Sequence, residues 1–136
     1  MKRIKLPAGK YFISDPCYVV PDEYWMDVLE ESDYFPRSEG GEANFNYKSK
    51  NHKVWAGGTA WGDGCYRSNE YREYGVDSGC IGITEWSQEL EDLLASKYGR
   101  QVTNGSLCRI KEFKNPFTIT IDNGRFRFDR EIINTK

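Results

Sequence analysis

The sequence contains a single histidine, His52, among its 136 residues. This scarcity disfavours a hydrolase with a Ser-His-Asp triad, because only one side chain could serve as the imidazole base. His52 precedes Lys53 at the start of a predicted strand, a position typical of a surface residue. The sequence also lacks a nucleophile elbow, a P-loop, a dinucleotide-binding glycine fingerprint and a histidine-based metal motif.

The four cysteines, Cys17, Cys65, Cys80 and Cys108, include no Cys-x-x-Cys pair. Such pairs organise zinc and redox sites, so neither kind of site is expected. No run approaches the 18 apolar residues that a membrane span needs, and no apolar segment of a signal peptide follows the charged start. We therefore expect a cytoplasmic protein with reduced thiols that does not bind a membrane.

Aromatic residues are abundant, at 15% of the chain, and they offset an otherwise polar composition. Each buried ring removes on the order of 150–250 Å² from water, so the chain can form a hydrophobic core. Its length is that of one domain, and we expect residues 1–136 to fold as a single domain.

Charge is unevenly distributed, although the formal net charge is only −2. Residues 1–96 carry 10 basic and 17 acidic side chains, whereas residues 97–136 carry 9 basic and 4 acidic ones. The small net charge gives no reason to expect sequence-specific binding of nucleic acid. The basic C-terminal part could nevertheless create one positive face suited to phosphate. The alternative is that the two halves attract each other within one fold.

Alternating and helical patterns predict an α+β fold, mainly an antiparallel β-sheet with two short packed helices. Residues 32–51 show no sustained period and are predicted as a long loop or irregular hairpin. The predicted helices cover residues 22–31 and 88–98, the second capped by Ser87 and closed by Gly99. The predicted strands cover residues 10–14, 53–61, 76–84, 107–113, 117–122 and 125–129.

The pair Asn123-Gly124 predicts a two-residue hairpin turn between the last two of these strands. This turn pairs Asp122 with Arg125 and therefore sets Ile121 opposite Phe126 on the buried face. Arg125 and Arg127 then point away from the core.

An aspartate at a tight turn, followed closely by a cysteine, occurs three times, at Asp15, Asp63 and Asp77. Converging carboxylates can bind Mg²⁺, orient a sugar hydroxyl or act as general bases. We assign Asp63 and Asp77 as catalytic candidates and Asp15 as a ligand-binding candidate, with a divalent cation, Mg²⁺ or Ca²⁺, as the candidate cofactor. The alternative is ordinary turn chemistry, in which each carboxylate bonds its own backbone.

Aromatic and basic side chains are interleaved with these turns. They suit stacking of a nucleotide base and pairing with its phosphate, although aromatic rings also fill the cores of small domains. The ligand-binding candidates of this kind are Tyr18, Thr59, Trp61, Tyr66, Arg67 and Arg72.

Three motifs resemble those of a family of small uncharacterised proteins from tailed phages and bacteria. They are Asp-Pro-Cys-Tyr-Val from Asp15, Gly-Asp-Gly-Cys-Tyr from Gly62, and Val-Asp-Ser-Gly-Cys-Ile-Gly from Val76. The resemblance covers roughly the first two thirds of the chain. It implies a phage-like origin, hence the cytoplasm of a host cell, and carries no established activity.

By analogy with small phage proteins that disarm host defence, we expect an accessory protein that binds a nucleotide-like immune signal such as a cyclic dinucleotide. In an enzymatic version it would cleave that signal as a phosphodiesterase-type hydrolase. The alternative is a protein-binding inhibitor of a host enzyme with no small-molecule ligand. Neither version excludes a homo-oligomer.

Overall fold

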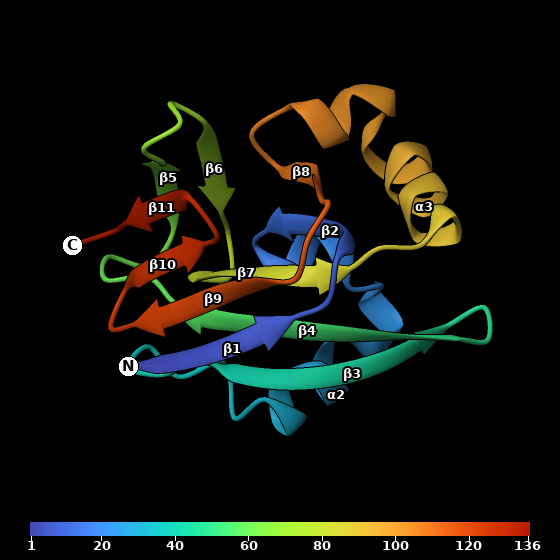
Figure 1. Cartoon of the computed structure of the whole chain (residues 1–136). Coiled ribbons are helices and arrows are strands. Elements are labelled where there is room, and N and C mark those ends of the chain that lie inside the picture. The colour runs from blue at the N-terminus through green and yellow to red at the C-terminus, as the bar shows by residue number, and fades with distance from the viewer.

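The computed structural model describes all 136 residues and confirms a β-rich α+β fold (Figure 1). One antiparallel sheet contains, in spatial order, β1 (Lys2–Leu6), β9 (Phe117–Asp122), β10 (Arg125–Phe128) and β11 (Glu131–Asn134). A second contains β3 (Gly41–Tyr47), β4 (Lys50–Gly58), β7 (Cys80–Glu85), β2 (Gly9–Ser14) and β8 (Cys108–Phe113). A two-stranded ribbon pairs β5 (Gly64–Arg67) with β6 (Glu73–Val76).

The molecule has three layers, which are the four-stranded sheet, the five-stranded sheet and the helices, and a hydrophobic core lies between each neighbouring pair. The first core joins the inner face of the four-stranded sheet, including Ile119 and Phe126, to residues such as Ile83 of the five-stranded sheet. The second lies on the other face of the five-stranded sheet and includes side chains of α1 (Pro16–Val19), α2 (Asp22–Glu31) and α3 (Gln88–Tyr98). A 3-10 helix, η1 (Arg100–Asn104), follows α3. The outer face of the four-stranded sheet and the helices therefore lie on opposite sides of the molecule.

Several predicted elements are confirmed. Strand β2 and helices α2 and α3 occupy the expected residues, and the Ser87 hydroxyl caps α3 by accepting a hydrogen bond from the Leu90 amide at 3.2 Å. The C-terminal hairpin has the predicted register, with Phe126 opposite Ile121. Its turn residues Asn123 and Gly124 have φ angles of 49° and 86°, the left-handed region that a two-residue turn of this type requires.

Of the two alternatives predicted for residues 32–51, a long loop or an irregular hairpin, the second half of the segment is a hairpin, but a regular one. Strand β3 pairs regularly with β4 through a turn at Lys48 and Ser49, whose φ angles are 48° and 67°. The β3 sequence is polar and contains residues of low strand propensity, so it gave no clear strand pattern. Its turn lacks the usual glycine, so no clear hairpin turn was indicated either. Strands β1, β5, β6 and β11 and helix α1 were also not predicted. The observed β4 ends at Gly58, and β7 begins only at Cys80.

His52 is buried, which corrects its assignment as a surface residue. Its Nε2 lies 2.7 Å from the Ser87 hydroxyl, and its Nδ1 lies 3.1 Å from the Lys50 carbonyl oxygen. The Lys50 carbonyl can only accept, so the neutral ring donates to it from Nδ1. Its Nε2 then accepts the proton of the Ser87 hydroxyl, whose oxygen in turn accepts from the Leu90 amide. Burial lowers the pKa of His52 below its usual value of 6.5.

Lowering the pH from 7.5 to 5.0 should therefore destabilise the protein through His52. The unfolded chain takes up a proton below about pH 6.5 whereas the folded chain resists it, so stability present above pH 6.5 is lost as the pH falls. The slope from this group is at most about 1.4 kcal/mol per pH unit. Urea unfolding of the wild type and His52→Gln at both pH values tests this, and equal losses in the two proteins would contradict it.

Candidate functional site

The Asp15 carboxylate is a structural group. Its Oδ1 accepts hydrogen bonds from the Cys17 amide at 2.9 Å and the Ser78 hydroxyl at 2.6 Å. Its Oδ2 accepts from the amides of Asp77 at 2.8 Å and Ser78 at 2.6 Å. The side chain is completely buried. Asp15 therefore caps α1 and ties it to the turn before β7, so its assignment as a ligand-binding residue is corrected.

The other two aspartate turns pack near this tie. The Thr59 amide donates to the Gly79 carbonyl at 2.8 Å, and a Cβ placed on Gly79 would meet Asp63 Oδ1 at 3.9 Å. The side chains of Asp63 and Asp77 are exposed and accept no hydrogen bond. The structure thus brings the three turns together but leaves only two of their carboxylates accessible. No group of three or more histidine, cysteine or acidic side chains is placed to hold a metal ion.

A strained backbone segment borders these turns. Asp33, Tyr34 and Phe35 have consecutive positive φ angles of 54°, 54° and 45°, a conformation that residues with a side chain rarely adopt. The Tyr34 hydroxyl donates to the Ser78 carbonyl at 2.9 Å. Burial, with smaller contributions from nearby acidic groups, raises the pKa of Tyr34. The segment therefore holds a neutral phenol against the turn.

Tyr18 lies on the same side as the Asp77 turn. Burial, with smaller contributions from Cys17 and Asp77, raises the pKa of Tyr18 to about 12. Its ring packs edge-on against Tyr98 with centroids 6.0 Å apart. Tyr18 is therefore a neutral, partly buried packing residue.

Thr59 and Tyr66 hold the loop between β4 and β5. Both hydroxyls donate to the Gly62 carbonyl, at 2.7 Å and 2.8 Å respectively. Thr59 is also buried and its hydroxyl is occupied, so it is not free to donate to a ligand. The Tyr66 ring is only partly buried, and its role in stacking stays a prediction. Trp61 in the same loop is 78% exposed, as a ligand-binding residue would be.

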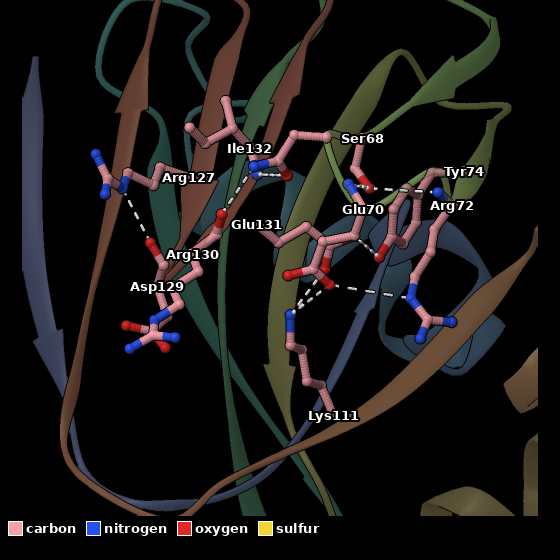
Figure 2. A network of polar contacts seen from close by, with 11 residues as sticks. Ser68, Glu70, Arg72, Tyr74, Lys111, Arg127, Asp129, Arg130, Glu131 and Ile132 are labelled. Atoms are coloured by element: carbon pink, nitrogen blue, oxygen red, sulfur yellow. Dashed lines mark hydrogen bonds and ion pairs between the residues drawn. The ribbon is translucent and has the colours of Figure 1, made fainter.

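Arg67 and Arg72 lie on the β5–β6 ribbon and face glutamates. Arg67 donates to Glu73 at 3.0 Å, and Arg72 Nε lies 4.0 Å from Glu70. Figure 2 shows that the Arg72 pair belongs to a larger network around Glu131. These guanidinium groups are exposed and partly neutralised by the glutamates, and their role in holding phosphate stays a prediction.

Glu131 is the buried centre of that network (Figure 2). It accepts hydrogen bonds from the Tyr74 hydroxyl at 2.7 Å and from the Lys111 ammonium group at 3.1 Å. Lys111 also contacts Glu70 at 3.2 Å. The three groups come from β11, β6 and β8, so this network joins the four-stranded sheet, the ribbon and the five-stranded sheet. It is a structural connection between sheets.

A hollow of about 570 Å³ lies on the outer face of the four-stranded sheet, and sequence reasoning did not place a site there. Its cationic groups are the Met1 ammonium and the guanidinium groups of Arg3, Arg125 and Arg127. We call this surface the arginine face; its other lining residues are Pro116, Phe117, Thr118, Thr120, Asp122, Asp129 and Ile132.

Strand pairing explains why these cations share one face. Arg3 and Arg127 both pair with Thr120, from opposite sides of the central strand β9. Arg125 lies two residues along the same strand as Arg127 and therefore points the same way. Neither Arg3 nor Arg125 forms an ion pair, and Arg127 Nε donates to the Asp129 carbonyl at 2.9 Å. The hairpin register and the basic C-terminal part were the two sequence signals that pointed here.

Comparison with known proteins identifies no relative. No protein-family model, no curated protein and no solved structure matches this chain. No helix of the structure is long and apolar enough to cross a membrane.

Proposed function

We propose that this protein binds a phosphate-bearing, nucleotide-like ligand on the arginine face. The observation that carries the proposal is the convergence of three guanidinium groups on one hollow, none of them in an ion pair with a carboxylate. Guanidinium is planar and donates two parallel hydrogen bonds to phosphate oxygens, which makes arginine the preferred partner of that group.

The spacing of the cations suits more than one phosphate. Neighbouring strands lie about 4.8 Å apart, so the Cα atoms of Arg3 and Arg127 flank Thr120 at roughly 10 Å from each other. Both long side chains can therefore reach a phosphate above Thr120, whose hydroxyl can donate to it. Arg125 lies about 7 Å further along the sheet, within reach of a second phosphate.

Isothermal titration calorimetry with inorganic pyrophosphate, ADP and a cyclic dinucleotide tests this proposal. The double variant Arg125→Ala, Arg127→Ala should weaken binding roughly 10-fold or more, because charge-assisted hydrogen bonds to phosphate are lost. Binding to the wild type should also weaken as salt rises, since the face is open to solvent.

The matched control is the double variant Lys48→Ala, Arg100→Ala. It removes the same charge from exposed positions that form no ion pair and lie outside the arginine face. Binding should be nearly unchanged. If no phosphate compound binds the wild type at millimolar concentration, or if both double variants bind alike, the proposal is wrong.

The proposal also concerns which ligand binds and whether the protein cleaves it. We propose an immune signal such as a cyclic dinucleotide as the ligand of a phage accessory protein, on the resemblance and analogy drawn from the sequence. For an enzymatic version, the sequence candidates Asp63 and Asp77 are exposed and can act as bases, but neither lines the arginine face, so cleavage would need the ligand to extend beyond that face. Product formation in the titration mixtures would reveal cleavage.

A protein-binding inhibitor is the second candidate function, and helix α2 favours it. Residues 22–33 carry six carboxylates and no basic side chain, and Met26 on the same helix is 72% exposed. An acidic surface with an exposed apolar side chain suits a basic protein partner. Absence of binding to every phosphate compound would favour this candidate over the first.

A further inference from the structure

Trp61 is placed in a way that packing does not explain. It is 78% exposed, whereas Trp55 is buried and the other two tryptophans are partly buried. Burying an indole ring removes more apolar surface from water than burying most side chains, so leaving one exposed forgoes stabilisation.

The loop that carries Trp61 is held firmly in place. The Ala60 amide donates to the Thr135 hydroxyl at 2.8 Å, and the Thr59 amide donates to Gly79. The Thr59 and Tyr66 hydroxyls both donate to the Gly62 carbonyl. Hydrogen bonds thus restrain the backbone on both sides of Trp61. The ring is therefore exposed although the backbone that carries it is held in place by hydrogen bonds.

This loop lies against the turn at the end of the arginine face. A Cβ placed on Gly124 would meet the Ala60 nitrogen at 3.0 Å, and Gly124 directly precedes Arg125. Because consecutive Cα atoms are about 3.8 Å apart, the Cα atoms of Trp61 and Arg125 are at most about 14 Å apart. Figure 1 shows the chain after β4 at the same end of the molecule as the β9–β10 turn.

We propose that Trp61 is the base-stacking subsite of the arginine face, so that a bound nucleotide places its base on the indole ring and its phosphates on Arg125 and Arg127. The inference rests on the proposed function, because it needs phosphate bound at this face. It adds that the ligand must carry an aromatic base at one end and that its orientation is set by Trp61. Stacking on an aromatic ring accepts any base, so the subsite selects nucleotides over plain phosphates without selecting one base.

Two probes separate the subsite from the phosphate site. ADP has both a base and two phosphates, and inorganic pyrophosphate has the phosphates alone. By titration calorimetry, Trp61→Ala should weaken ADP binding roughly 5- to 150-fold, the range found for single stacked bases, and leave pyrophosphate binding unchanged. Trp61→Phe should retain most of the ADP affinity, since it keeps an aromatic ring.

Tyr71→Ala is the matched control, because Tyr71 is an aromatic residue that is 84% exposed on the β5–β6 ribbon. It should change neither affinity. Unchanged ADP binding by Trp61→Ala, or an equal loss for both probes, would overturn the stacking subsite while leaving phosphate binding intact. If the wild type binds neither probe, the proposed function and the subsite both fail.

Discussion

Replacing Phe126 by alanine is expected to lower the free energy of unfolding by about 3–5 kcal/mol. Phe126 is completely buried in the core between the two sheets. Its ring also fills the space above Gly57 of β4, where an added Cβ would come within 3.3 Å of it. Neighbouring backbone of the sheet cannot collapse into the resulting cavity, so both transfer and cavity costs apply. Urea unfolding, with the midpoint and the slope measured together, gives the value.

Arg127→Ala is the control for that measurement. Arg127 is adjacent in sequence but points to solvent from the opposite face of β10, so its replacement should change stability by about 0.5 kcal/mol or less. A loss below about 1 kcal/mol for Phe126→Ala would show that the ring is not part of a tightly packed core.

Asp15→Asn should lower the free energy of unfolding by about 3–6 kcal/mol. Asparagine has nearly the same shape, but its amide nitrogen is a donor and must face either Oδ1 or Oδ2 partners that are themselves donors. In the orientation that keeps the bonds to Oδ1, the amides of Asp77 and Ser78 lose their acceptor. Each lost charge-assisted bond in a buried site costs about 1.5–3 kcal/mol.

The same substitution at Asp77 controls for the change of residue type. Its carboxylate is exposed and accepts no hydrogen bond. The free energy of unfolding of Asp77→Asn should therefore lie within about 0.5 kcal/mol of the wild-type value. Thermal and urea unfolding of the two variants in parallel decide the question. Equal stability of Asp15→Asn and Asp77→Asn would mean that the buried carboxylate does not tie the turns together.

The sequence correctly predicted the elements whose structure depends on residues close to each other in the chain. Asn123-Gly124 specified the turn, the turn specified the register, and the register correctly sent Arg125 and Arg127 to the solvent side. Strand β1 was not predicted, because its partner β9 lies more than 110 residues away and no local pattern encodes that pairing. Arg3 was therefore missed as part of the arginine face, although the positive charge of the C-terminal part was recognised.

The three aspartate turns illustrate a different limit. Asp15, Asp63 and Asp77 occur in similar turn sequences, yet one is buried and bonded while two are exposed. The burial of each aspartate depends on which other segments pack over its turn. The sequence of the turn itself does not specify those segments. His52 was misassigned for the same reason, because its partner Ser87 comes from the start of α3, 35 residues further along the chain.

The pairing of β1 with β9 also determines when the four-stranded sheet can form during synthesis. Ribosomes add about 5–20 residues per second, so β1 waits roughly 6–23 s before its partner strand is made. During that interval β1 is an unpaired strand of the kind that associates with other chains. Lys2, Arg3 and Lys5 place three positive charges on its five residues, and mutual repulsion between nascent chains protects it. We therefore expect these cations to oppose association of β1 with other chains until β9 has been made.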